Sequence, residues 1–238
     1  MEHQMEYFQF RGNSNKLFGK RIQPHERENQ NMREYWEEKF KTEGIMWDFF
    51  PSDSAMWTLE IFKTNKLNRI LIPGFGYGRN AKFFIENGFD VTGIEISQSA
   101  IDLAKANGLN CMIHHGSVIS MPFDDKIYDG IFCYALIHLL NKAERKVFLK
   151  SCFNQLKNNG LMFFVVASNK MSMYGTGKNL SKNRFKISRG LNVFFYDSES
   201  VSREFSPFGL IDYQMIEEPV KFMKGQDPMK MLFVRCKK

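Results

Sequence analysis

Residues 69–97 read RILIPGFGYGRNAKFFIENGFDVTGIEIS, and this stretch decides how the chain folds. Two apolar runs in it, at 69–73 and 90–95, have the length and composition of buried strands. Between them, a glycine-rich turn leads into a stretch with helical character that stops at Gly88, a residue type common at helix ends. The second run ends on a carboxylate, Glu95. The order predicts a strand, a glycine-rich loop, a helix and a second strand with an acidic tip.

The turn carries glycines at alternate positions, Gly74, Gly76 and Gly78. Glycine lets the backbone approach a ligand closely, and the helix that follows offers free N–H groups at its start. A carboxylate about 20 positions after such a loop can accept hydrogen bonds from a ribose, which is the role we predict for Glu95. The third glycine of the dinucleotide fingerprint is replaced by Arg79, so the pattern is G-x-G-x-G and indicates a nucleoside cofactor without a pyrophosphate.

This pattern between two strands resembles motif I of the class I S-adenosylmethionine-dependent methyltransferases, and the resemblance covers about residues 35–237. In that family the loop passes beneath the methionine and ribose of the cofactor, and the acidic residue holds both ribose hydroxyls. The resemblance implies S-adenosylmethionine as the cofactor. The residues that it places there are Gly74, Phe75, Gly76, Gly78, Asn80, Glu95, Ile96, Ser117, Val118, Tyr134, Trp47 and Trp36.

Further stretches point to a branch of the family. Residues 71–76 and 93–97 look most like the thiopurine and thiol methyltransferases, and the segment with Trp36 and Trp47 resembles the Trp-rich part of that branch, which folds over the cofactor. Residues 78–81 also resemble the tellurite-resistance-type methyltransferases. The resemblance is therefore nearest these two branches.

Two positions depart from the family pattern. Ile72 stands where many members carry an acidic residue that binds the amino group of the cofactor. Ser117 stands where many members have an acidic residue paired to the adenine amino group. A hydroxyl accepts that hydrogen bond more weakly than a carboxylate, so we expect a modest affinity for the cofactor.

The rest of the chain alternates strands and helices. This alternation predicts an α/β fold, a Rossmann-like, mostly parallel sheet of seven strands with helices on both faces. The last two strands have no obvious helix between them and predict a C-terminal antiparallel hairpin. The predicted strands are 69–73, 90–95, 111–114, 128–134, 161–167, 210–217 and 229–236, with a turn at 158–160, and the predicted helices are 32–43, 53–64, 79–87, 97–106, 142–156 and 197–209.

Length and composition favour one globular domain in the cytosol. Of 238 residues, 43% are hydrophobic, no apolar run is long enough to span a bilayer, and no export signal is visible. We expect a polar extension at 1–31 and a methyltransferase domain at 32–238, with 32–66 as a helical lid over the cofactor. The four cysteines form no C-x-x-C pair, so we predict neither a disulfide framework nor a metal site.

Catalytic candidates follow the fourth strand. Methyl transfer from a sulfonium is an in-line displacement that needs alignment and exclusion of water, and aromatic walls suit the lost positive charge. Trp47, Phe75 and Tyr134 are candidate wall residues. Tyr134 and His138 are four residues apart, so a helical turn would place them on one face. His138 could act as a base, or it could be a partly buried histidine that only hydrogen-bonds the backbone, and a thiolate would need no base.

The net charge of +7 leaves the acceptor open. Between Ser168 and Tyr196 the chain has six cationic residues and no acidic one, which indicates a solvated surface loop or a rim that attracts an anionic substrate. We predict transfer of a methyl group to a small-molecule nucleophile, through sulfur, oxygen or another soft atom. The alternatives are a nucleic-acid methyltransferase, which residues 133–136 make less favoured because they lack the base-gripping pattern, a non-catalytic cofactor-binding protein, and a dinucleotide oxidoreductase.

Overall fold

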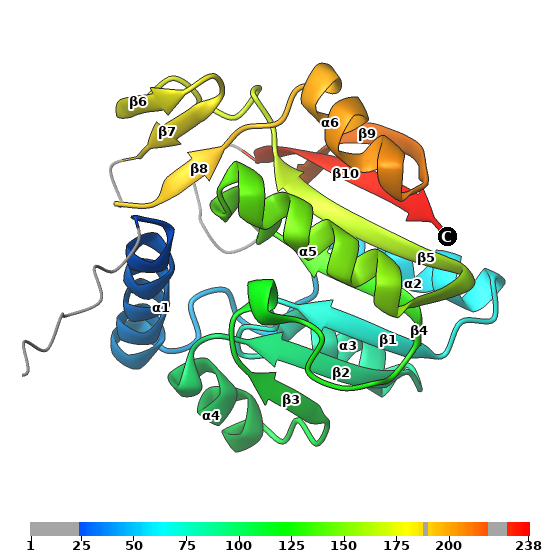
Figure 1. Ribbon diagram of the computed structural model, residues 1–238. Helices are drawn as coiled ribbons and strands as arrows, with labels where there is room; N and C mark the ends of the chain where they lie inside the picture. Colours follow the sequence, from blue (N-terminus) through cyan, green and yellow to red (C-terminus); the bar gives the residue numbers. More distant parts are fainter. Residues whose placement is uncertain (1–23, 188–189, 219–227) are drawn as a thin grey trace, which may run out of the picture.

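A computed structural model describes residues 24–187, 190–218 and 228–238. Its centre is a seven-stranded sheet in the order β3-β2-β1-β4-β5-β10-β9 (Figure 1). The strands are β1 (Arg69–Pro73), β2 (Asp90–Glu95), β3 (Met112–His115), β4 (Tyr128–Tyr134), β5 (Leu156–Ala167), β9 (Leu210–Glu218) and β10 (Met229–Lys237). The helices are α1 (Pro24–Glu43), α2 (Asp53–Thr64), α3 (Arg79–Glu86), α4 (Gln98–Ala106), α5 (Lys142–Gln155) and α6 (Ser198–Phe205).

The predicted fold class is confirmed. Strands β1 to β5 pair in parallel, whereas β10 pairs antiparallel with both β5 and β9. The C-terminal hairpin is therefore present, and its second strand lies inside the sheet between β5 and β9. Because β1, β2 and β4 are parallel neighbours, their carboxyl ends meet at one edge of the sheet, where α/β proteins of this type bind ligands.

Each face of the sheet carries its own core. On one face, Phe62 of α2 and Phe84 of α3 are fully buried against Phe132 and Phe163 of the sheet. On the other face, α5 and α6 contribute a second cluster that includes Phe148, Cys152, Val201 and Phe205. Burying a large aromatic side chain stabilises the fold by about 1.5–3 kcal/mol, so these layers hold the ligand-binding edge in place.

The helix starts are set by local sequence. Ser52, predicted as a cap, accepts a hydrogen bond from the N–H of Ala55 and begins α2 as expected. The first helix begins at Pro24 rather than at the predicted 32, and proline suits a first helical position because its missing N–H would have no helical partner there. The predicted extension up to residue 23 lies outside the described residues.

Two predicted irregular segments are more regular than expected. The segment 168–196 contains a separate antiparallel sheet of β6 (Lys178–Ser181), β7 (Arg184–Lys186) and β8 (Asn192–Phe194), so its interpretation as a plain loop was wrong. Figure 1 shows this small sheet next to α5 and α6, apart from the main sheet. The predicted turn at 158–160 is an irregularity within β5, where Asn159 has a φ of 65°.

No helix in the described part of the chain combines the length and apolar character needed to cross a membrane.

Candidate active site

The glycine-rich loop lies across the carboxyl ends of β1 and β2. The N–H groups of Gly74 and Phe75 both donate to the carbonyl of Ile94, at 2.9 and 3.0 Å, which closes the loop onto β2. Gly76 and Gly78 have φ values of 57° and 85°, in the left-handed region that disfavours residues with a side chain. The turn therefore requires glycine and keeps the backbone open to an approaching ligand.

Glu95 ties the loop to the tip of β2. Its Oε2 accepts the N–H of Gly76 at 2.7 Å, and its Oε1 accepts the N–H groups of Ile96 and Ser97, both at 2.9 Å. The side chain is buried, and burial raises the pKa of Glu95 above its usual value, although the three N–H groups oppose that shift. A carboxylate fixed in this way beside a glycine loop can accept further hydrogen bonds from a vicinal diol.

Phe75 is in the loop, but its ring packs in the core beneath it. A Cβ at Gly93 would lie 2.2 Å from the Phe75 ring, and one at Gly78 would lie 2.8 Å from it. These two glycines make the space that the ring fills, and Phe75 is buried. Its side chain therefore does not form the aromatic wall that we predicted, whereas its backbone remains part of the loop.

Asn80 is engaged by the start of α2. Its Oδ1 accepts hydrogen bonds from the N–H of Ser52 at 2.9 Å and from the Ser52 hydroxyl at 3.2 Å. In the same region, Glu218 accepts the N–H groups of Asp53 and Ser54, so two polar side chains hold the first turn of α2. The structure thus gives Asn80 a positioning role between α2 and α3.

Trp36 and Trp47 lie in an aromatic cluster next to the loop. Trp47 stacks on Tyr77, with ring centroids 6.4 Å apart, and Trp36 packs against Phe40, which in turn contacts Tyr77. The Tyr77 hydroxyl donates to the carbonyl of Asp48 at 2.7 Å and accepts the N–H of Trp47 at 3.0 Å. Tyr77, between two glycines of the loop, thus fastens the segment after α1 to the predicted cofactor site.

Helix α1 is fastened at a second point. Glu37 accepts hydrogen bonds from the hydroxyls of Ser97 and Ser99, at 2.8 and 2.7 Å, and from the N–H of Ser99. These donors lie at the start of α4, directly after Glu95, where a negative charge is favoured by the helix dipole. Burial opposes ionisation of Glu37, but the hydrogen bonds from the two serines dominate and lower its pKa. The N-terminal segment therefore contacts both parts of the site, the loop and the end of β2.

We expect Tyr77→Phe to lower the free energy of unfolding by about 1–2 kcal/mol, because it removes both hydrogen bonds to the 47–48 backbone while keeping the stacked ring. Urea denaturation measures this change. Tyr213→Phe is the matched control, because the Tyr213 hydroxyl makes no hydrogen bond among the described residues. Equal free energies of unfolding for the two variants would show that the hydrogen bonds between Tyr77 and the 47–48 backbone do not stabilise the protein.

The end of β3 brings Ser117 and Val118 beside Glu95. The N–H of Gly116 donates to the Glu95 carbonyl at 2.8 Å, which places the 116–118 turn against the tip of β2. Val118 is buried and Ser117 half-buried, and no side-chain cap bond occupies the Ser117 hydroxyl. Ile96 is fixed through its backbone, whose carbonyl contacts His115 Nε2 at 3.1 Å. The sequence prediction of this grouping at one edge agrees with the structure.

Tyr134 and His138 do not share a helical face. Tyr134 is the last residue of β4, and Ala135 after it has a φ of 54°, so no helical turn joins the two positions. The Tyr134 ring packs with the α2 and α3 layer, whereas the residues on either side of His138 pack elsewhere. The prediction that a helical turn places Tyr134 and His138 on one face was wrong, because β4 ends at Tyr134 and Ala135 has a left-handed backbone conformation.

Arg79 is a residue that sequence reasoning missed. Its guanidinium lies over the Tyr134 ring, 5.3 Å from the ring centroid, and it begins α3 directly after the glycine loop. An arginine here can hold a carboxylate or a polar substituent of a ligand at the loop. Arg79 replaces the third glycine of the dinucleotide fingerprint, and this departure from the pattern could have identified it as a site residue.

His138 lies in the 3₁₀ turn Ile137–Leu139 after β4 and is buried. Its Nδ1 accepts the N–H of Ala167, the last residue of β5, at 3.1 Å. Burial lowers the pKa of His138 to about 4. The imidazole is therefore neutral at physiological pH, with one nitrogen already occupied.

Comparison with known proteins decides the class. Residues 70–160, which contain the loop, Glu95, Ser117, Tyr134 and His138, match the family model of the methyltransferase domain. The match confirms the predicted enzyme class and its cofactor, S-adenosylmethionine. The thiol branch within the class is not settled by it.

Solved methyltransferase structures share the fold. The chain is similar to the 1,6-didemethyltoxoflavin-N1-methyltransferase of Burkholderia thailandensis, with 15% identity, 91% of each chain covered and a TM-score of 0.69. It is also similar to TehB from Haemophilus influenzae, with 17% identity, 87% of this chain and 66% of that chain covered and a TM-score of 0.56. For the glycopeptide N-methyltransferase MtfA the identity is 15%, the coverage 75% and 85%, and the TM-score 0.55. No curated protein sequence matches the chain.

Proposed function

We propose that this methyltransferase transfers the methyl group of S-adenosylmethionine to a small-molecule nucleophile. The observation that carries the proposal is the hydrogen bond between Glu95 and Gly76, because it joins the two parts of the site that a nucleoside cofactor needs. Glu95 would accept the ribose hydroxyls, the loop backbone would hold the methionine part, and Ser117 and Val118 would hold the adenine. Trp47, Trp36 and the rest of the 32–66 lid cover the cofactor.

Methyl transfer from a sulfonium depends more on alignment of the acceptor with the methyl group than on acid–base catalysis. Bound S-adenosylmethionine would supply an electrophilic methyl group, and transfer in line with the departing sulfur would leave the carbon–sulfur electron pair on sulfur and remove the sulfonium charge. The aromatic side chain of Trp47 suits a site where a positive charge is lost, because its face would attract the sulfonium and exclude water. The chain then releases the neutral thioether product of the cofactor.

A small-molecule acceptor is consistent with both the sequence and the neighbours. Two of the matched structures are named as N-methyltransferases, one of 1,6-didemethyltoxoflavin and one of a glycopeptide. The small sheet beside α5 and α6 carries the exposed cations Lys178 on β6 and Lys186 on β7, and these cations favour an anionic acceptor. We therefore include thiolates and halides among the candidate acceptors.

Thermal shift tests the cofactor part of the proposal. A ligand that binds only the folded state at 100 times its Kd stabilises it by about 2.7 kcal/mol, which raises the Tm of a domain of this size by roughly 5–10 °C. We expect this shift with S-adenosylhomocysteine and none with NAD. The reverse preference would replace the methyltransferase assignment by that of a dinucleotide oxidoreductase.

A panel of acceptors tests the transfer itself. The chain is incubated with S-adenosylmethionine that carries a labelled methyl group, together with simple thiols, thiopurines, halide ions and a short RNA. We expect label in a thiol or thiopurine product. Label in the RNA alone would favour the nucleic-acid enzyme, and binding without any labelled product would leave a non-catalytic cofactor-binding protein.

A further inference from the structure

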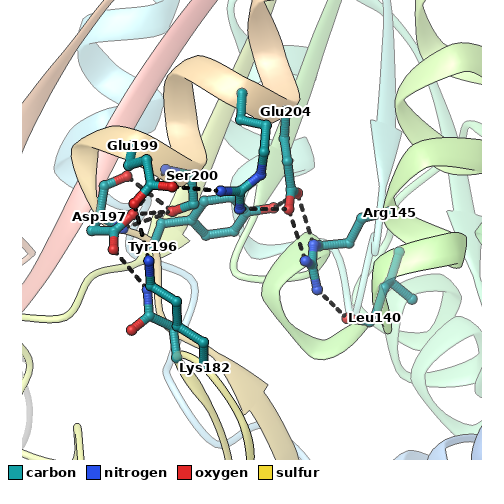
Figure 2. A network of polar contacts seen from close by, with 10 residues as sticks. Leu140, Arg145, Lys182, Tyr196, Asp197, Glu199, Ser200 and Glu204 are labelled. Atoms are coloured by element: carbon teal, nitrogen blue, oxygen red, sulfur yellow. Dashed lines mark hydrogen bonds and ion pairs between the residues drawn. The ribbon is translucent and has the colours of Figure 1, made fainter.

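The turn that carries His138 is held on both sides. Behind it, the carbonyl of Leu140 accepts a hydrogen bond from Arg145 at 3.1 Å, and Arg145 is itself fixed by two 2.8 Å bonds to Glu204 (Figure 2). In front of it, the imidazole accepts the N–H of Ala167, whose carbonyl in turn accepts the N–H of Tyr196 at 2.8 Å. The imidazole therefore has one defined position at the carboxyl ends of β4 and β5.

The bond to Ala167 determines which ring nitrogen carries the proton. A backbone N–H can only donate, so Nδ1 must offer its lone pair, and the proton of the neutral ring resides on Nε2. The two nitrogens of an imidazole point in nearly opposite directions, so the Nε2–H bond is directed away from Ala167. No hydrogen bond among the described residues uses Nε2.

This geometry does not suit a general base. Nδ1 has no free lone pair while the Ala167 bond exists, and Nε2 already carries a proton. Burial alone also opposes a charged imidazole. What the side chain can offer a ligand is one fixed N–H donor.

On the basis of the proposed function, we propose that His138 binds the methyl acceptor by donating Nε2–H to it, and that the acceptor carries a hydrogen-bond-accepting oxygen or ring nitrogen beside its nucleophilic atom. The nucleophile attacks with its own lone pair, and the electron pair of the broken carbon–sulfur bond stays on the departing thioether. A thiolate gives a neutral product, whereas a neutral N–H or O–H nucleophile gives a cation that then loses its proton to water. No proton passes to His138 in this step, and a thiol loses its proton to water before the attack.

A purely structural role is the rival interpretation, because His138 would be needed only to satisfy the Ala167 N–H. Two substitutions separate the roles. In His138→Asn the amide oxygen can take the place of Nδ1, but nothing donates at the Nε2 position. In His138→Gln the amide nitrogen can take the place of Nε2, but the acceptor for Ala167 is lost.

We expect His138→Asn to keep the urea midpoint of the wild type and to lose about tenfold in kcat/KM with 6-mercaptopurine, a thiol with ring nitrogens beside the sulfur. His138→Gln should unfold at a lower urea concentration and retain more of the kcat/KM. If the asparagine variant is fully active, the role of His138 is structural and the proposal is overturned.

Spectroscopy tests the proton position without any activity. We expect NMR of protein labelled with ¹⁵N-histidine to show the Nε2–H form of His138 as the single species from pH 5 to 8, and kcat to show no ionisation of His138 over the same range. A proton on Nδ1, or a rate that rises through a histidine ionisation, would overturn the proposal.

The outcomes also separate this proposal from the proposed function. If no acceptor of the panel is methylated, the proposed function fails and the acceptor role of His138 fails with it, whereas the NMR spectrum still tests the position of its proton. If simple thiols are methylated but 6-mercaptopurine is not, the enzyme is a methyltransferase and our inference about the acceptor is wrong.

Discussion

We expect the free energy of unfolding of Arg145→Met to be about 3 kcal/mol lower than that of the wild type. Arg145 is buried, its guanidinium makes two 2.8 Å bonds to Glu204, and it lies 3.9 Å from the centre of the Phe194 ring. Removing one partner of a buried ion pair typically costs 3–5 kcal/mol, because the remaining charge is left without its counter-ion. We place the cost at the lower end because the Tyr196 hydroxyl still donates to Glu204 at 3.0 Å.

Urea denaturation measures this value, and a second arginine that contacts Glu204 serves as the control. Arg203 is also paired to Glu199 and Glu204, but its side chain is 49% exposed, so Arg203→Met should cost less than about 1 kcal/mol. The double variant Arg145→Met/Glu204→Gln should be more stable than Arg145→Met, since it also removes the stranded carboxylate. Equal losses in the two arginine variants would show that burial does not set the strength of this network.

Glu95→Gln should weaken the binding of S-adenosylhomocysteine by more than about 100-fold, or about 3 kcal/mol. The amide keeps the shape of the side chain but offers one acceptor oxygen in place of two. Its NH₂ group would face either the N–H of Gly76 or those of Ile96 and Ser97, all of which are donors. Both the ribose contact and the anchorage of the glycine loop are therefore lost together.

Isothermal titration calorimetry measures this effect. Glu86→Gln is the matched control, because Glu86 lies at the end of α3 with a side chain that is 61% exposed. We expect the control to bind like the wild type. An unchanged affinity in Glu95→Gln would refute the ribose role of Glu95, and the proposed geometry of the site with it.

The parts of the site that follow from short-range patterns were predictable. The glycine loop and Glu95 are separated by one helix, and a strand, loop, helix and strand in that order leave little freedom in where they meet. Ser117 followed for the same reason, since it begins the turn after the next strand. The alternation of strands and helices also fixed the fold class and the hairpin of β9 and β10.

Features that depend on contacts between distant segments were not predictable. The hydrogen bonds between Tyr77 and residues 47 and 48 can be predicted only when the folded position of the N-terminal segment is known. The hydrogen bond from Ala167 to His138 likewise depends on the relative register of β4 and β5. The small sheet was missed because its cations suggested a loop. Alternation of buried Phe185 and Ile187 with polar residues was the signal that indicates a strand there.

The position of β10 has a consequence for how the protein acquires its structure. Strand β9 is made first in chain order, yet among the strands that the structure describes its only neighbour is β10, which must insert between it and β5. Until then β9 has no partner strand among the described residues, and its nine residues expose an unpaired edge. We therefore expect the last step in assembly of the sheet to be joint docking of the two strands, and folding intermediates to be prone to aggregation through that edge.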